Sequence, residues 1–235
     1  MERELVAKEA AIPDIVIRRL PIYARGLRHL LNNGRLTVSS NELADAIGVT
    51  AAQIRRDLSY FGRFGKQGKG YDVPTLIEAV QEILNIDRRW DVALAGYGHL
   101  GQAIADYGGF EPSSFRIAAI FDRAPHLIGR RSARGVVVQH ESAIAETVRR
   151  LNIRMGIVAV PADQAQEVTE RLLAGGVRAI LNYAPVTLRV PEGVWVREID
   201  PISLMQSMTY YLEDEPVPAT PESDYSVAYT DAAGN

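Results

Sequence analysis

The chain contains no cysteine, which excludes disulfide bonds, cysteine metal ligands and a thiol redox sensor. No hydrophobic run is long enough to span a bilayer. The first residues, Met1-Glu2-Arg3-Glu4, do not follow the pattern of a signal peptide. We therefore expect a cytoplasmic protein in which any redox sensing passes through a bound ligand.

Charged residues make up a moderate fraction of the chain, but acids and bases are unevenly distributed along it. The 235 residues are 47% hydrophobic and 23% charged, which is typical of a soluble globular chain with one large or two small domains. The net charge of −3 argues against nucleic-acid binding. Residues 15–70, however, carry ten Lys and Arg against three acids, a net +7, whereas the segment from Glu213 carries six acids and no base. A basic region on an acidic chain is typical of a nucleic-acid-binding module.

Residues 1–12 are predicted to be a frayed leader, and residues 13–82 a small helical domain. A helical stripe of apolar residues follows Pro21, which suits the first turn of a helix or a helix break. Asn33-Gly34 should end that helix. The pair Ser39 and Glu42 has the spacing of a capping box at the start of the next helix.

A second capping box is expected at Thr50 and Gln53, after a tight turn at Gly48-Val49. The helix that begins there places Ile54 and Leu58 on one face and leaves arginines outside it. Two short helices joined by a glycine turn indicate a helix-turn-helix.

Residues 61–71 read F-G-R-F-G-K-Q-G-K-G-Y, and this glycine-rich basic segment should form a wing beside a DNA duplex. A solvated basic face is the alternative interpretation. The residues predicted to bind DNA are Thr50, Gln53, Arg55, Arg56, Ser59, Arg63, Lys66 and Lys69.

Residues 88–200 alternate strand-like and helix-like runs, which predicts a mostly parallel sheet with helices on both faces. Strands are expected at 91–95, 116–121, 135–138, 155–160, 178–181 and 194–199, and helices at 99–107, 141–150, 163–174 and 202–212. The pattern is shorter than a full six-stranded, two-halved dinucleotide fold with helices throughout. The acidic segment 213–235 is predicted to be disordered.

A G-x-G-x-x-G motif follows the first of these strands, and Asp122 closes the next one about twenty residues on. In this order the motif predicts a dinucleotide site, with pyrophosphate at the helix N-terminus. Asp122 should bind the adenosine ribose and favour NAD, although Arg123 could accept the 2′-phosphate of NADP. The predicted loop residues are Gly96, Tyr97, Gly98, His99, Leu100 and Gly101.

Two later strand ends should complete the site, because ligands bind at the carboxyl ends of strands in such sheets. They are Val160-Pro161 and the run Asn182, Tyr183, Ala184 and Pro185, where the nicotinamide half is expected. Without a ligand both would be plain strand–loop junctions.

Enzymatic activity is less well supported. The four histidines are best explained as exposed or structural, and no lysine follows Lys69 to act as an acid or base. Tyr107 and Asp200 could form an acid–base pair, but they are more often structural residues. An NAD-dependent dehydrogenase and a winged-helix regulator with a vestigial dinucleotide domain remain alternatives to a ligand-responsive DNA-binding protein.

Several runs, taken in order, resemble the bacterial redox-sensing repressor family Rex. They are R-R-L-P-I-Y (18–23), Q-I-R-R-D-L-S-Y-F-G (53–62), G-K-G-Y (68–71), G-Y-G-H-L-G-Q-A-I-A-D-Y-G-G-F (96–110) and I-L-N-Y-A-P-V (180–186). The resemblance covers about residues 13–212.

The resemblance implies a non-enzymatic homodimer with an N-terminal winged helix and a C-terminal Rossmann domain. It also implies that the last helix, 201–212, is swapped between subunits. NADH would release an inverted-repeat operator, and NAD⁺ would compete for the site without releasing it. Asp200 would pair with Arg25 in one state and with Tyr107 in the other.

Overall fold

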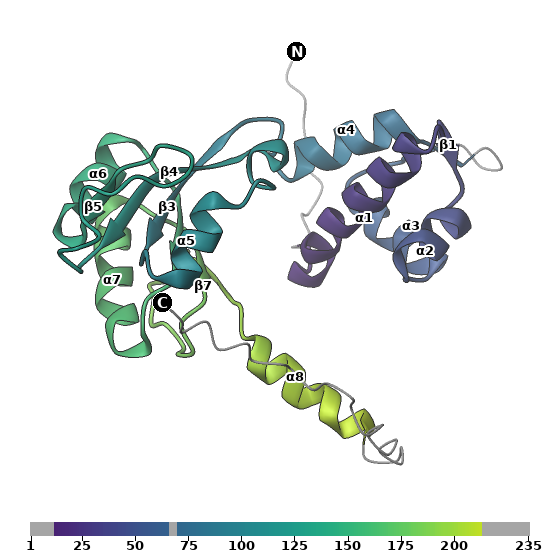
Figure 1. Ribbon diagram of the computed structural model, residues 1–235. Helices are drawn as coiled ribbons and strands as arrows, with labels where there is room; N and C mark the ends of the chain where they lie inside the picture. Colours follow the sequence, from purple (N-terminus) through teal and green to yellow (C-terminus); the bar gives the residue numbers. More distant parts are fainter. Residues whose placement is uncertain (1–11, 66–69, 213–235) are drawn as a thin grey trace, which may run out of the picture.

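The computed structural model describes residues 12–65 and 70–212. Its N-terminal half is a helical module, and α4 leads from this module into an α/β half built on a parallel sheet (Figure 1). The helix α8 projects from the sheet half. The α-helices are α1 (Asp14–Asn32), α2 (Ser40–Ile47), α3 (Ala51–Ser59), α4 (Val73–Ile83), α5 (His99–Asp106), α6 (Ile144–Arg150), α7 (Ala162–Gly175) and α8 (Pro201–Thr209).

Short 3₁₀ helices and eight strands complete the described elements. The 3₁₀ helices are η1 (Glu111–Ser113), η2 (Glu141–Ala143) and η3 (Tyr210–Leu212). The strands are β1 (Thr37–Val38), β2 (Tyr71–Asp72), β3 (Trp90–Ala95), β4 (Phe115–Asp122), β5 (Val138–His140), β6 (Met155–Val158), β7 (Ala179–Asn182) and β8 (Trp195–Glu198).

The first helix, α1, continues through Pro21. The prediction that Pro21 starts or breaks a helix is therefore wrong. Leu20, Tyr23 and Leu27 share one face of α1 and are at most 1% exposed. Packing of this face against the rest of the module stabilises the helix even though Pro21 lacks an N–H for the ladder. The helix ends at Asn32, as the Asn33-Gly34 pair predicted.

The helix caps of the helix-turn-helix agree with the predicted ones, with one exception. Ser39 and Glu42 form the predicted reciprocal capping box. The Ser39 backbone and side chain, together with Arg35, lower the pKa of Glu42 to about 2. Gly48 ends α2 in the left-handed region, at φ 72°. Thr50 caps α3 as expected, but Gln53 donates its side-chain amide to Asp57 (2.7 Å), so the second capping box is only half formed.

The base of the wing is a two-residue antiparallel pair, in which Val38 faces Tyr71 and Thr37 faces Asp72. Gly70 is in the left-handed region, and a side chain there would collide with the Val38 carbonyl. Lys66 and Lys69, the predicted wing contacts, lie outside the described residues.

The large sheet has six strands, all parallel, in the order β5-β4-β3-β6-β7-β8. Starting from β3, this is the 3-2-1-4-5-6 order of a dinucleotide-binding fold. All six strands of this fold are present, but the connections β4–β5 and β7–β8 contain no helix. The predicted strand 135–138 is displaced to Val138–His140, because Val137 instead makes an antiparallel bridge to Arg131.

Alternating residues of β3 build the core on both faces of the sheet. Val92 and Leu94 pack with α5 residues, whereas Ala93 and Ala95 pack with residues of α6 and α7. Figure 1 shows α5 and the α6–α7 pair on opposite sides of the strands. The carboxyl ends of the central strands are thereby held in a fixed frame.

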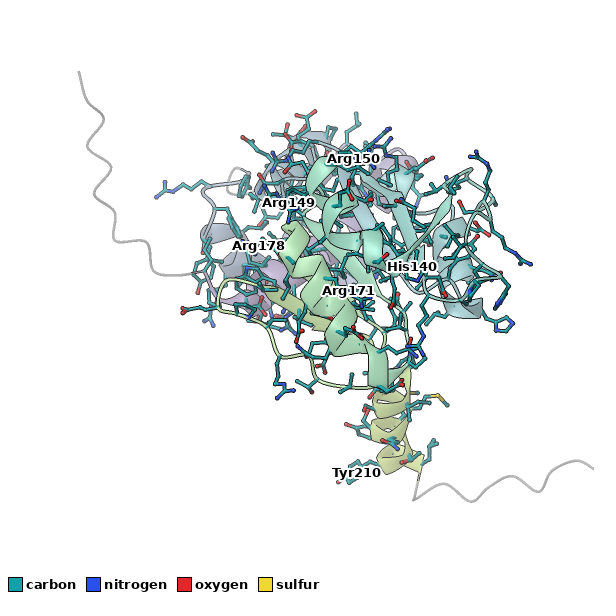
Figure 2. All side chains as sticks on the ribbon, turned by 90° about the vertical axis from the view of Figure 1, so that its left-hand side faces the viewer. His140, Arg149, Arg150, Arg171, Arg178 and Tyr210 are labelled. Carbon is teal, nitrogen blue, oxygen red and sulfur yellow. The ribbon has the colours of Figure 1, made fainter. Side chains whose placement is uncertain are left out.

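Unlike the other α-helices, α8 contains no buried residue. Its apolar side chains are more than half exposed: Ile202, Leu204, Met205 and Met208, followed by Tyr210, Tyr211 and Leu212 in η3. Figure 2 shows the helix, with Tyr210 at its end, standing away from the sheet half. An apolar helix in this position requires a partner surface.

Candidate functional site

The glycine motif forms a tight strand–turn–helix junction. Gly96 has φ 98°, and a side chain there would lie 2.3 Å from the Ala159 carbonyl oxygen. A side chain at Gly101 would lie 2.0 Å from the carbonyl oxygen of Gly96, so only glycine lets α5 sit this close to the loop. Gly98, by contrast, faces open space, and no side chain caps the N-terminus of α5. An anionic group can therefore approach this helix end.

Asp122 joins the end of β4 to the glycine loop. Its carboxylate accepts hydrogen bonds from the backbone N–H of Tyr97 (2.6 Å) and of Ala124 (2.8 Å). Each carboxylate oxygen has two lone-pair sites, so both oxygens can accept a further donor such as a ribose hydroxyl. The aspartate thus orients the loop and remains available to a ligand.

A cavity of about 350 Å³ opens at these strand ends, within the size range of small-molecule sites. Six predicted ligand residues line it: Gly96, Gly98, Asp122, Arg123, Val160 and Pro161. The lining residues that sequence reasoning missed include His126, Leu127, Glu141, Ile144, Gln164 and Val168. They come from loops and helices distant in sequence, and only the fold brings them together.

The other predicted loop residues do not line this cavity. Tyr97 and Gly101 are buried in the packing of α5, whereas His99 and Leu100 are exposed at its first turn. At the end of β7, Asn182 is fully buried and its amide closes a turn, with hydrogen bonds to Ala184 and Val186. Asn182 therefore shapes the 183–185 loop.

The three residues of the expected switch do not meet within this chain. Asp200 caps α8 through hydrogen bonds from the backbone of Ile202 and Ser203, and the Ser203 hydroxyl holds the pKa of Asp200 below its ordinary value. Arg25 is exposed on α1, and Tyr107 stands edge-on to Phe110, 5.5 Å between ring centroids. Within residues 12–65 and 70–212, no hydrogen bond or ion pair joins Asp200 to either of them.

The helix α3 presents its basic residues outward. Arg55 and Arg56 are exposed, with Arg55 donating to the Ser40 hydroxyl (2.7 Å) and thereby lying across α2 and α3. The Ser59 hydroxyl bonds back to the Arg56 carbonyl, and Arg63 is exposed beyond the helix. Gln53 is half-buried and engaged by Asp57, so its amide faces the protein instead of solvent.

A buried ionic cluster that sequence reasoning missed fixes α3 on α1. Asp57 is 0% exposed and accepts two hydrogen bonds from Arg19 (2.5 and 2.8 Å), one from the Tyr23 hydroxyl (2.5 Å) and one from Gln53. Burial alone would raise the pKa of Asp57, but these donors outweigh it and hold the pKa below its ordinary value. Burial and this carboxylate raise the pKa of Tyr23. The single acid in the run R-R-D-L was the available clue.

Helix-turn-helix modules joined to a dinucleotide-type cavity define a class of ligand-responsive DNA-binding regulators. Comparison with known proteins supports both halves. A family model described as "Putative DNA-binding protein N-terminus" matches residues 11–59, and one described as "CoA binding domain" matches residues 87–186.

The curated relatives are named redox-sensing transcriptional repressor Rex. One from Roseiflexus sp. (strain RS-1) is 57% identical over 85% of this chain and 90% of its own length. Another from Streptomyces coelicolor is 41% identical over 87% of this chain and 79% of its own length. The chain belongs to the Rex family of redox-sensing transcriptional repressors.

Solved structures agree with this assignment. The crystal structure of RSP in complex with beta-NAD⁺ and operator DNA matches with a TM-score of 0.82 and 40% identity, over 86% of this chain and 93% of RSP. RSP in complex with beta-NADH matches with a TM-score of 0.78 and 38% identity, over 86% of this chain and 95% of RSP. Over the described ranges, no helix is long and apolar enough to cross a membrane, and no group of three or more His, Asp or Glu could hold a metal ion.

Proposed function

We propose that this protein represses transcription as a homodimer and senses the NADH/NAD⁺ ratio. It binds an inverted-repeat operator and is released by NADH. The observation that carries the proposal is the open cavity at Gly96, Gly98 and Asp122 on the same chain as the outward-facing arginines of α3. RSP, to which the chain is similar, has been solved with NAD⁺ and operator DNA and with NADH.

The dinucleotide binds across the carboxyl ends of the strands. Its pyrophosphate lies at Gly98 and the α5 N-terminus, and its adenosine ribose lies at Asp122. Arg123 stands beside Asp122 on the cavity wall, where it can contact the adenosine half. The nicotinamide half extends toward Val160-Pro161 and the 183–185 loop shaped by Asn182.

The DNA contacts divide into two kinds. Arg55 and Arg56 enter the major groove from α3, where bidentate arginine contacts can distinguish bases. Arg63 and the wing lysines Lys66 and Lys69 contact phosphates, which supplies affinity and salt dependence.

The dimer forms through α8. Its exposed apolar side chains, Ile202, Met205 and Met208 among them, need cover that the described chain does not provide. A second copy supplies it by receiving α8 between its own two halves, and the swap is reciprocal. This exchange carries Asp200, the α8 cap, to the partner's Arg25 or Tyr107.

Switching rests on the charge of the nicotinamide ring, which is neutral in NADH and positive in NAD⁺. Only a difference in affinity between the two protein states can shift their populations. NADH favours the state in which Asp200 leaves Arg25 for Tyr107, so the two α3 helices no longer match successive major-groove faces. The protein acts as a regulator without catalysis, since the relatives are named transcriptional repressors.

Titration of NADH, and separately of NAD⁺, into the protein bound to a fluorescent inverted-repeat DNA tests this function. Anisotropy should fall at a far lower concentration of NADH than of NAD⁺. Tight DNA binding that neither nucleotide disturbs would favour a vestigial dinucleotide domain. Absence of specific DNA binding would favour the dehydrogenase.

A further inference from the structure

An apolar groove lies at the edge of the sheet opposite the dinucleotide cavity. The first residues of four strands form its apolar wall: Trp90 of β3, Phe115 of β4, Met155 of β6 and Trp195 of β8. The groove has a volume of about 420 Å³, and Trp195 is 62% exposed. An exposed tryptophan on an apolar surface is typical of a binding site.

The charge at this groove is positive. Arg154 and Arg178 line it, and neither aspartate nor glutamate is among its lining residues. Arg88 lies over the Trp90 ring, 4.4 Å from its centroid. Figure 2 shows Arg178 on the sheet half, well apart from Tyr210. An occupant of this groove should therefore be both apolar and acidic.

The C-terminal segment of this same chain has that composition. Residues 213–235 carry six acids and no base, whereas the N-terminal segment 1–11 carries three acids and two bases. Within 222–231, the acids Glu222, Asp224 and Asp231 are interleaved with Tyr225 and Tyr229. The tyrosines suit the tryptophan-lined wall, and the carboxylates suit the two arginines.

The C-terminal segment is also long enough to reach from the end of η3 to the groove. The path back to the groove is about 20 Å along α8 and η3 and about 20 Å across the sheet. The twelve residues 213–224 span about 40 Å when extended. Tyr225 and Tyr229 can therefore reach the groove.

We propose that residues 222–231 dock in this groove, with Tyr225 and Tyr229 against Trp195 and Met155. The carboxylates of Glu222, Asp224 and Asp231 face Arg154 and Arg178. The connection from α4 to β3 also lines the groove, through Leu84 and Ile86. The docked segment thus touches the junction between the DNA-binding module and the sheet.

Tryptophan fluorescence tests the proposal directly, because the chain has two tryptophans and both line the groove. The full chain is compared with a chain that ends at Leu212 and with the full-length variant Glu222→Gln/Asp224→Asn/Asp231→Asn. Both changes should shift the emission to longer wavelength and increase acrylamide quenching. Salt at 1 M, where the Debye length is about 3 Å, should do the same to the unmodified chain. Identical spectra and quenching for all three proteins would overturn the proposal.

Cysteine pairing provides a second test that does not depend on the tail's charge, since the chain has no native cysteine. Ser223→Cys with Ala179→Cys, a groove residue whose replacement leaves both arginines in place, should oxidise to a disulfide readily. The matched control is Ser223→Cys with Arg189→Cys, an exposed site outside the groove, and this pair should oxidise much more slowly. A non-reducing gel shows whether the segment comes from the same chain or a second copy, and either result supports docking. Equal oxidation rates for the two cysteine pairs would overturn the proposal. So would a chain ending at Leu212 whose operator affinity changes while its tryptophan emission does not.

Discussion

Replacement of Asp57 by alanine should destabilise the DNA-binding module severely, because it removes the acceptor for four hydrogen bonds at the α1–α3 contact. Arg19 and Tyr23 would be left with buried donors. Breaking a buried ion pair costs about 3–5 kcal/mol. The Arg19 side chain keeps 19% exposure and can be partly hydrated, so we expect a value near 3 kcal/mol. For a module of this size that corresponds to a fall in Tm of about 12–24 °C.

Circular dichroism melts of Asp57→Ala and of the exposed control Asp45→Asn measure this effect. The control should melt within a few degrees of the unmodified chain, since surface substitutions usually stay within about 0.5 kcal/mol. Arg19→Met/Asp57→Leu, which removes both charges, should be less destabilised than Asp57→Ala alone. If Asp57→Ala melts like the control, the buried cluster does not hold α3 on α1.

The same cluster gives a defined pH dependence. The folded pKa of Asp57 lies below its unfolded value of about 3.9. The stability it contributes is therefore fully present above about pH 4 and is lost as the pH falls through the folded pKa. Asp57→Ala should lose this acid-dependent component, so its stability and that of the unmodified chain should converge on acidification. A stability difference that stays constant from pH 6 to pH 2.5 would contradict the ionic interpretation.

Three further predictions concern the ligand and the switch. Asp122→Ala removes a charged acceptor that also holds the Tyr97 N–H. Both NADH and NAD⁺ should therefore bind about 10- to 100-fold more weakly, as measured by calorimetry. Unchanged affinities would show that Asp122 does not bind the dinucleotide. Gly101→Ala places a methyl group 2.0 Å from the Gly96 oxygen and should weaken NADH binding by at least about tenfold; normal binding would show that the loop can yield. Arg25→Ala should leave NADH affinity nearly intact while NADH no longer releases DNA. A large loss of NADH affinity would instead place Arg25 in the ligand pocket. Because coupling is reciprocal, operator DNA should weaken NADH binding to the unmodified protein but not to Arg25→Ala.

The sequence by itself determined those features that depend on local chemistry. The Ser39 capping box, the Gly48 turn and the G-x-G-x-x-G junction each place a cap or a glycine where the backbone requires it, and the structure contains all three. The strand–helix alternation likewise predicted a parallel sheet, and its central strands β3 and β6 are apolar and mostly buried.

Tertiary structure decided what depends on contacts between distant segments. Propensity at Pro21 predicted a helix boundary, but burial of Leu20 and Tyr23 against the module keeps α1 continuous. Gln53 had the spacing of a capping partner, yet Asp57 offers its amide a better acceptor. Asp57, an acid in the basic helix α3, is the centre of a buried cluster because α1 packs Arg19 and Tyr23 against it. These two residues are 38 and 34 positions away in the sequence. Such contacts leave no periodic pattern in the chain, since they arise only when separate elements pack together.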